Sequence, residues 1–204
     1  MTTKFSDECS VERGAETGSQ WVFCLPHERY NKEAVKPYTK GKDISIMVWA
    51  CIWYTGRSEL IIMERDEDAP QRGYTANSYY KALDEGLVPC YGPSEPFVQD
   101  NVSIHTARSS QHWLEKHGVW VLNWPPFSPD LNPIEHAWFA LKRLLEEHYP
   151  ELNTMGQTAK ERELFKQATK HCWQIIPQTL FQQVISSMGR RLQAVRQAQS
   201  WYKK

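Results

Sequence analysis

The segment Ile44–Tyr54 reads ISIMVWACIWY and is followed closely by Gly56. Its β-branched and aromatic residues predict one long strand within a sheet. Shorter segments of similar composition flank it and are set off by turn-forming residues; these segments are Lys4–Cys9, Trp21–Leu25 and Glu59–Met63. Consecutive strands joined by turns favour an antiparallel meander in this part of the chain.

Further along the chain, strands are expected to alternate with helices. The expected elements are a helix at Thr75–Leu87, a strand at Phe97–Asp100, a helix at Ala107–His117, a strand at Val119–Trp124, and helices at Asn132–Tyr149, Thr158–Ile176 and Gln178–Trp201. This order predicts an α/β fold, in which a mixed sheet of three antiparallel and two parallel strands is flanked by helices. Residues 1–150 would form the main domain, and residues 151–204 a basic helical extension of the same domain.

The bulk composition suits one globular domain. Of the 204 residues, 41% are hydrophobic and 24% are charged, which is ordinary for such a domain. No apolar run reaches about 18 residues, so a membrane-spanning helix is not expected, and the N-terminal residues lack the apolar core of a secretion signal. The five cysteines are scattered without a C-x-x-C pair, which favours buried free thiols over a disulfide framework or a zinc site.

The formal net charge of zero hides an asymmetry along the chain. Residues 1–102 carry 11 Lys and Arg against 16 Asp and Glu, whereas residues 103–204 carry 13 against 8. After Leu164 the charged residues are all basic; they are Lys166, Lys170, Arg190, Arg191, Arg196, Lys203 and Lys204. A basic face of this kind is compatible with a polyanion such as DNA, but charge alone favours a solvated helical surface.

Three carboxylates could meet near one end of the predicted sheet. The strand Phe97–Asp100, within FVQDNVSIHTA, ends on a carboxylate, and parallel pairing with the first strand would place Asp7 beside Asp100. Glu135 follows Asp100 with 34 residues between them. Neighbouring like charges repel and require a cation, and Mg²⁺ prefers oxygen ligands. Two such ions held by three carboxylates suit in-line displacement at a phosphodiester.

Glu135 also has a local explanation. Asn132 is suited to cap the helix and Pro133 to begin it, so that Glu135 would take the third helical position. A glutamate at that position closes a capping box by bonding the backbone of the cap. Local sequence alone favours this role for Glu135.

Several motifs in order resemble the catalytic domain of mariner-superfamily DNA transposases of the Asp-Asp-Glu (DDE) branch and fungal type. The motifs are FSDE around Asp7, QDN around Asp100 with His105 soon after, and WPPFSPDLNPIEHAW, which contains Glu135. ISIMVWACIW, MERD and GYTANSYYKAL are similar to the segments between the first two acids in that family. The resemblance spans about Lys4 to Tyr149.

This resemblance implies a ribonuclease H-like fold with Asp7, Asp100 and Glu135 as the catalytic and metal-binding triad. Two Mg²⁺ ions, with Mn²⁺ as a substitute, would support cleavage at transposon ends and attack of the freed 3′-hydroxyl on target DNA. Asn101 and His105 would support the site without binding metal, and Asp130 would be a turn or helix-entry residue. The family further implies double-stranded DNA as the partner, a homodimer for the full-length protein, and a nuclear location.

Full-length members of that family also carry N-terminal helix-turn-helix domains, which this chain is expected to lack, since Asp7 lies so near its start. The leading hypothesis is therefore a metal-dependent DNA endonuclease and strand transferase without its recognition domains. The alternative is a catalytically inactive, truncated or domesticated fragment that acts as a DNA-binding or interaction module. A third hypothesis is a nuclease that acts on RNA–DNA hybrids.

Overall fold

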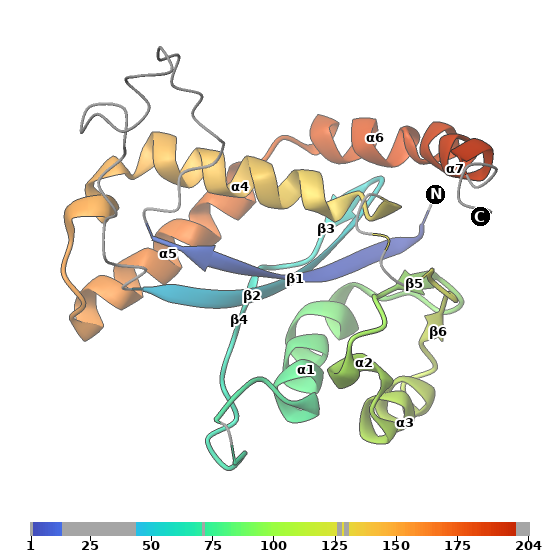
Figure 1. The fold of residues 1–204 in the computed structure, drawn as a ribbon, viewed down its shortest axis with the longest axis horizontal. Helices are drawn as coiled ribbons and strands as arrows, with labels where there is room; N and C mark the ends of the chain where they lie inside the picture. The colour runs from blue at the N-terminus through green and yellow to red at the C-terminus, as the bar shows by residue number, and fades with distance from the viewer. Residues whose placement is uncertain (1, 14–43, 71, 126–127, 129–130, 199–204) are drawn as a thin grey trace, which may run out of the picture.

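A mixed sheet separates two layers of helices in the computed structural model, which describes residues 2–13, 44–70, 72–125, 128 and 131–198 (Figure 1). Within these residues the sheet has six strands in the order β3-β2-β1-β5-β6, and β4 also pairs with β2. The strands are β1 (Lys4–Glu12), β2 (Ser45–Trp53), β3 (Gly56–Arg57), β4 (Ile61–Met63), β5 (Pro96–Val98) and β6 (Trp120–Val121). The α/β class with a mixed sheet and flanking helices is confirmed.

The antiparallel half of the sheet is centred on β2, which is the segment predicted as the long strand. β1 pairs with β2 from Phe5 opposite Ile52 to Glu12 opposite Ser45. The other edge of β2 pairs antiparallel with two short strands, β3 and β4, each of which covers a different part of β2. The predicted strand Trp21–Leu25 lies outside the described residues.

The parallel half of the sheet begins where β5 pairs with β1. Lys4 lies opposite Phe97 and Phe5 opposite Val98, and β6 then pairs in parallel with β5. Continuing the register of β1 and β5 by two residues sets Asp100 level with Asp7. The strand itself ends at Val98, so Asp100 lies just beyond its carboxyl end, whereas the sequence predicted a strand that ended on Asp100.

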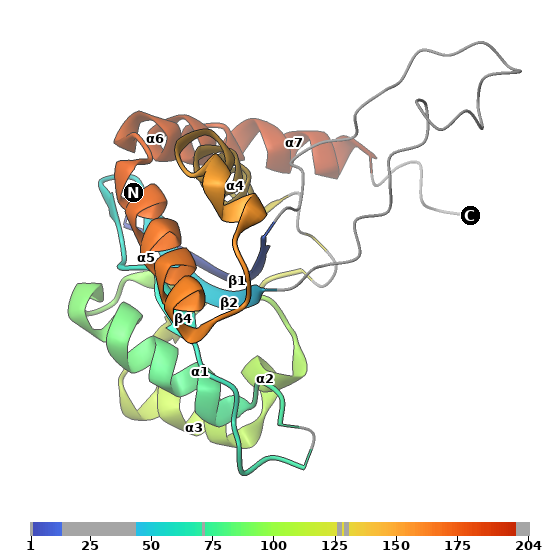
Figure 2. The same ribbon diagram turned by 90° about the vertical axis from the view of Figure 1, so that its left-hand side faces the viewer.

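Helices cover both faces of the sheet (Figure 2). One layer contains α1 (Ala76–Ala82), the π-helical η1 (Leu83–Leu87), η2 (Val88–Cys90), α2 (Ser103–Thr106) and α3 (Arg108–Lys116). The other contains α4 (Ile134–His148), η4 (Pro150–Thr154), α5 (Ala159–Ile175), α6 (Gln178–Ser186) and α7 (Met188–Ala198). Within the described residues, no helix is both long enough and apolar enough to cross a lipid bilayer.

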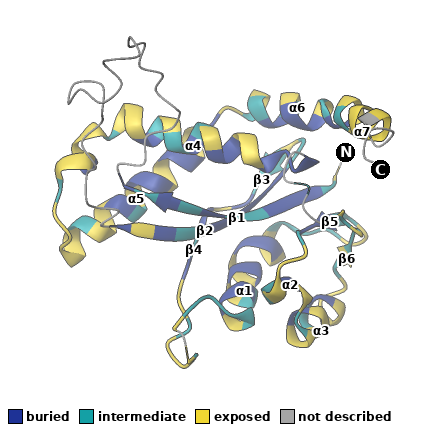
Figure 3. Cartoon of the chain, viewed as in Figure 1, coloured by how far each residue is buried: buried dark blue, intermediate teal, exposed yellow. Residues whose placement is uncertain are grey.

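Two hydrophobic cores lie on opposite faces of the sheet (Figure 3). Side chains alternate along β1, so Phe5, Cys9 and Val11 join the core beneath α4, α5 and α6. The same alternation puts Asp7 on the α4 face and Glu8 on the face covered by α1, α2 and α3. Neighbouring acids of the FSDE motif therefore serve different sides of the sheet.

Some element boundaries differ from those predicted. The helix expected at Gln178–Trp201 is two helices within the described residues, α6 and α7, which are separated at Ser187. Ser187 Oγ donates a hydrogen bond to the Val184 carbonyl at 2.6 Å, a local contact that competes with regular helix geometry. Gly118 follows the end of α3 and has a φ of +63°, a backbone conformation that suits glycine.

Replacing Gly86 with alanine is expected to destabilise the protein by roughly 1–3 kcal/mol through overpacking. A methyl group at this position of η1 would overlap the buried ring of Trp49 and press on Ile61. Urea denaturation would measure the loss. Gly73→Ala is the matched control, since no atom lies within 4 Å of its added methyl; equal stability of the two variants would contradict the close packing of η1 on β2.

Candidate active site

Three elements bring the predicted carboxylates to one region of the sheet. Asp7 lies within β1, Asp100 follows the carboxyl end of β5, and Glu135 lies in the first turn of α4. The register of β1 and β5 sets Asp100 level with Asp7. The negative charge of Glu135 acts on Asp7 from the α4 side, so residues far apart in sequence share one electrostatic environment.

Asp7 is a partly buried carboxylate surrounded by negative charge. Burial, followed by the charges of Glu8 and Glu135, raises the pKa of Asp7 to about 7. A hydrogen bond from Trp138 Nε1 to Asp7 Oδ2 at 3.1 Å opposes this shift without cancelling it. Asp7 is thus partly protonated near neutral pH when no cation is present, and a bound cation would favour its ionised form.

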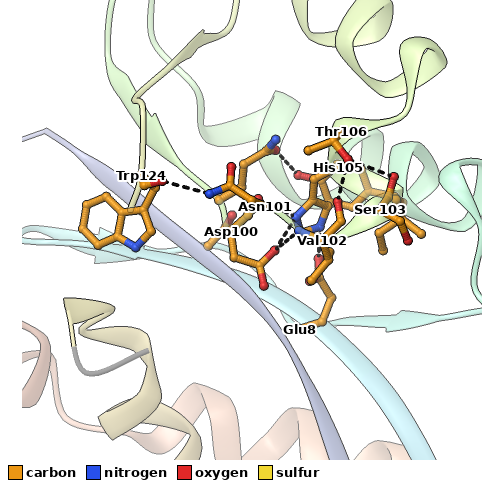
Figure 4. Close-up of polar contacts among 12 residues, drawn as sticks. Glu8, Asp100, Asn101, Val102, Ser103, His105, Thr106 and Trp124 are labelled. Carbon is orange, nitrogen blue, oxygen red and sulfur yellow. Dashed lines mark hydrogen bonds and ion pairs between the residues drawn. The ribbon is translucent and has the colours of Figure 1, made fainter. Parts of the chain in front are cut away.

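Asp100 is held by His105, which also reaches Glu8 (Figure 4). His105 Nδ1 lies 2.7 Å from Asp100 Oδ1, and His105 Nε2 lies 3.2 Å from Glu8 Oε1. Burial disfavours protonation of His105, but the two carboxylates outweigh it and raise the pKa of the ring to about 10. A protonated His105 therefore bridges Glu8 and Asp100 at neutral pH.

The same bridge keeps Asp100 ionised. Burial would raise the pKa of Asp100, but hydrogen bonds from His105 and from the Val102 backbone N–H lower it overall. The Asp100 side chain is 45% exposed, whereas that of His105 is 2% exposed. An ionised carboxylate thus faces solvent from a rigid, buried support.

Further polar contacts fix the loop that carries Asp100. Tyr79 Oη donates to the buried Gln99 Oε1 at 2.5 Å, and the Tyr79 ring packs against the His105 ring. Asn101 Nδ2 donates to the Trp124 carbonyl at 2.9 Å, which ties the loop to the segment after β6 (Figure 4). Asn101 and His105 therefore make supporting contacts.

The start of α4 is tied directly to β1. The buried Asn132 donates from Nδ2 to the Ser6 carbonyl at 3.1 Å, and its Oδ1 accepts from the Ile134 N–H at 3.4 Å. The residue at the cap position is Pro133, whose own side chain makes no capping hydrogen bond. Glu135 is consequently the second helical residue, one position short of the capping box that local sequence favoured. Its side chain is exposed.

The α7 helix also contacts the start of α4. Arg191 Nη2 donates to His136 Nε2 at 2.6 Å. Burial and then the charge of Arg191 lower the pKa of His136, which is consistent with a neutral ring that accepts this hydrogen bond. A basic helix is thereby attached to the residue that follows Glu135.

A family model described as "DDE superfamily endonuclease" matches residues 3–155 of the chain. The chain belongs to the DDE superfamily endonucleases. It is 31% identical to the Tc1 transposase of Caenorhabditis elegans over 94% of the chain and 66% of that protein. It is also 31% identical to the Tcb1 transposase of Caenorhabditis briggsae, over 97% of the chain and 68% of that protein. These relatives place this DDE endonuclease in the mariner/Tc1 group of transposases, and the chain spans about two thirds of their length.

Solved structures share its fold. The Mos1 strand transfer complex matches with a TM-score of 0.62 and 17% identity, over 93% of the chain and 52% of the Mos1 chain. The Mos1 transposase catalytic domain with raltegravir and Mg matches with a TM-score of 0.53 and 15% identity, over 93% of the chain and 79% of that domain. At this level of identity the likeness shows the common ribonuclease H-like fold.

The side chains of this DDE endonuclease fit a hard divalent cation by their chemistry. Asp7, Asp100 and Glu135 supply carboxylate oxygens, and a bound cation would oppose the two effects that raise the pKa of Asp7, which are first its burial and then repulsion from Glu8 and Glu135. Within the described residues, however, no three His, Cys, Asp or Glu side chains are grouped closely enough to enclose one metal ion. Asp100 turns its Oδ1 toward His105. The triad as a set of metal ligands therefore stays a prediction.

Sequence reasoning missed two supporting residues of the DDE endonuclease. Glu8 is adjacent to Asp7 in the FSDE motif, yet it bonds His105 on the opposite face. Trp138 is one of the buried residues of α4, yet its indole N–H donates a hydrogen bond to Asp7. The alternation of β1 and the three-residue spacing of Trp138 from Glu135, which puts both on neighbouring turns, are the signals that could have indicated these contacts.

Proposed function

We propose that this chain performs the DNA cleavage and strand transfer of a transposase, with Asp7, Asp100 and Glu135 as ligands of divalent metal ions. The observation that carries the proposal is that Glu135, in the first turn of α4, acts electrostatically on Asp7 in β1, while Asp100 follows β5, the parallel neighbour of β1. The pKa of about 7 for Asp7 supports it, because burial beside two further carboxylates leaves a site that favours a cation.

The comparisons support both the metal and the substrate. The related Mos1 catalytic domain has been solved with Mg and with Mn. Mos1 has also been solved in a strand transfer complex and in a paired-end complex with a transposon end. We infer the same classes of partner here: Mg²⁺ or Mn²⁺, two ions in the active state, and double-stranded DNA.

Each side chain of the site has a role that follows from its contacts. Trp138 holds Asp7 through Oδ2, His105 holds Asp100 through Oδ1, and Asn132 holds the first turn of α4 against β1. When bound, the metal ions would supply Lewis-acid activation of the attacking oxygen and charge stabilisation at the leaving oxygen. Metal binding would draw these carboxylates closer together, because among the described residues no three such side chains are grouped closely enough to enclose one ion and Asp100 turns its Oδ1 toward His105.

Cleavage of plasmid DNA tests the proposal. Incubation of the chain with supercoiled plasmid is expected to produce nicked circles in Mg²⁺ or Mn²⁺ and none in EDTA. The same assay with an RNA–DNA hybrid of identical sequence distinguishes two kinds of enzyme. A transposase-type enzyme should cleave duplex DNA in preference, whereas a hybrid nuclease should cleave the RNA–DNA hybrid in preference. DNA binding without any metal-dependent nicking would overturn the proposal in favour of an inactive DNA-binding module.

The homodimer and the nuclear location expected for the whole protein belong to the same proposal. Both follow from the substrate, since two transposon ends must be brought together and chromosomal DNA must be reached. Sedimentation of the full-length protein with end-containing DNA and microscopy of a tagged copy would check them.

A further inference from the structure

We propose that the exposed side of α4 and the adjoining helix α7 bind the unpaired end of a DNA strand as it leaves the active site. Phe139 would stack on an unpaired base, and the arginines of α7 would contact the phosphates. The inference rests on the proposed function, because it names the part of the DNA that this surface recognises.

Phe139 is an exposed aromatic side chain one helical turn after Glu135. It is 56% exposed, and no large apolar side chain among the described residues is more exposed. It lies four residues after Glu135, so the two side chains share one face of α4, one turn apart. The buried apolar residues of α4 face the core; Phe139 therefore contributes nothing to that core and presents its ring to solvent.

Positive charge on α7 lies close to the first turn of α4. Within its described length, α7 contains Arg190, Arg191 and Arg196 and has no acidic residue. The hydrogen bond from Arg191 to His136 fixes α7 beside the first turn of α4, and His136 precedes Phe139 by three residues on the same side of the helix. Both helices lie on the same side of the sheet (Figures 1 and 2).

An aromatic ring beside basic side chains suits single-stranded nucleic acid. Bases in an intact duplex are already stacked on each other, so an exposed ring can stack only on a base that has lost its neighbour or its partner. Arginines contact the backbone phosphates irrespective of sequence. A surface of this kind one turn from Glu135 would hold the strand end that cleavage produces. Leu192 and Val195 are exposed on α7 as well, so self-association is the competing use of this surface.

Binding in EDTA tests the inference without requiring cleavage. Two fluorescent probes are compared: a blunt duplex, and the same duplex with a three-nucleotide unpaired 3′ end that contains 2-aminopurine. Phe139→Ala is expected to weaken binding of the overhang probe about tenfold and to change blunt-duplex binding less than about twofold. Stacking of Phe139 on the unpaired end should change the fluorescence of 2-aminopurine when the parent protein binds. Phe139→Trp should retain both this change and the affinity for the overhang probe, whereas Phe139→Ala should lose both.

Two further variants make the test specific. Trp120→Ala removes an aromatic side chain of similar exposure, 53%, from the edge strand β6 and should leave both affinities unchanged. Arg190→Gln should weaken both probes and reduce the slope of affinity against salt by about one. Thermal unfolding of each variant confirms the fold, since the substituted side chains are exposed.

The inference would be overturned if Phe139→Ala weakened binding of both probes equally or did not weaken binding at all. It would also be overturned if Trp120→Ala weakened binding of the overhang probe as much as Phe139→Ala. A fall in self-association with unchanged overhang binding would also overturn it and assign the surface to protein contact. Failure of the proposed function looks different, because a chain that never nicks DNA can still show the overhang preference, and an active chain can lack it.

Discussion

Replacing Asp7 with asparagine is expected to reduce metal-dependent DNA cleavage by on the order of 10³-fold, because the proposed metal site would lose one ligand charge. The same substitution should stabilise the metal-free protein at pH 8 by roughly 2–4 kcal/mol. The buried carboxylate is repelled by Glu8 and Glu135, whereas a neutral amide of the same shape retains an oxygen that accepts the hydrogen bond from Trp138.

The sign of the pH dependence follows from the raised pKa. The pKa of Asp7 rises from 3.8 to about 7 on folding, so between these values the folded protein binds a proton that the unfolded chain has released. The free energy of unfolding therefore falls as the pH rises through this window. The destabilisation caused by ionised Asp7 is complete above about pH 7 and absent below about pH 3.8. Asp7→Asn should remove this destabilisation.

Urea denaturation at pH 4, 6 and 8 in EDTA measures this effect. Asp84→Asn, an exposed aspartate of η1, is the matched control and should change neither stability nor cleavage appreciably. Adding Mn²⁺ should raise the melting temperature of the parent protein but not that of Asp7→Asn. A variant that is no more stable at pH 8, or that still cleaves DNA, would contradict the position assigned to Asp7.

Replacing His105 with alanine is expected to destabilise the protein by roughly 3 kcal/mol or more, because a buried charged partner is removed. His105 is almost fully buried between Glu8 and Asp100. Its loss leaves Glu8, which is only 13% exposed, without its counter-charge. Most of the lost free energy of unfolding should come from the uncompensated charge of Glu8, because the more exposed Asp100 can be solvated by water.

A double-mutant cycle isolates the bridge. Glu8→Gln and His105→Gln are each expected to be destabilising, and their coupling energy should be about 1–3 kcal/mol. His112→Gln, at an exposed position of α3, is the control and should be near neutral. A coupling energy near zero would mean that the contact between His105 and Glu8 does not hold the loop of Asp100.

The contacts of protonated His105 with Glu8 and Asp100 also predict that the protein loses stability at alkaline pH. The pKa of His105 rises from 6.5 to about 10 on folding, so the stability gained from its charge is complete below about pH 6.5 and is lost as the pH rises through about 10. Denaturation at pH 7 and at pH 10.5 should show this loss in the parent protein. The loss should be smaller in His105→Gln, because that side chain has no charge to lose.

The elements that local sequence specifies strongly were predicted well. β2 was predictable because a run of β-branched and aromatic residues strongly favours a buried strand. α4 was predictable because its buried apolar residues recur at helical spacing. Boundaries were less predictable: β5 ends two residues before Asp100, and α6 ends at Ser186, because such ends depend on contacts that form only within the fold.

The candidate site was predictable only as a set of residue types. Asp7, Asp100 and Glu135 could be named from motif order, spacing and family resemblance, and the register of β1 and β5 agrees with the parallel pairing predicted for Asp7 and Asp100. The supports of the site were missed. Glu8 and His105 are 97 residues apart, and no local pattern connects residues at that separation.

The sequence alone determined the order of strands and helices, the family, and the three acids that lie close to the predicted site. The elements follow from local composition and periodicity, whereas the family and its three acids follow from the resemblance of the ordered motifs to that family. Tertiary structure alone decided that the adjacent Asp7 and Glu8 work on opposite faces of β1, and that Trp138 and His105 are their partners. The physical reason is that alternation assigns each side chain to a face, whereas the packing of helices on that face selects the group it meets.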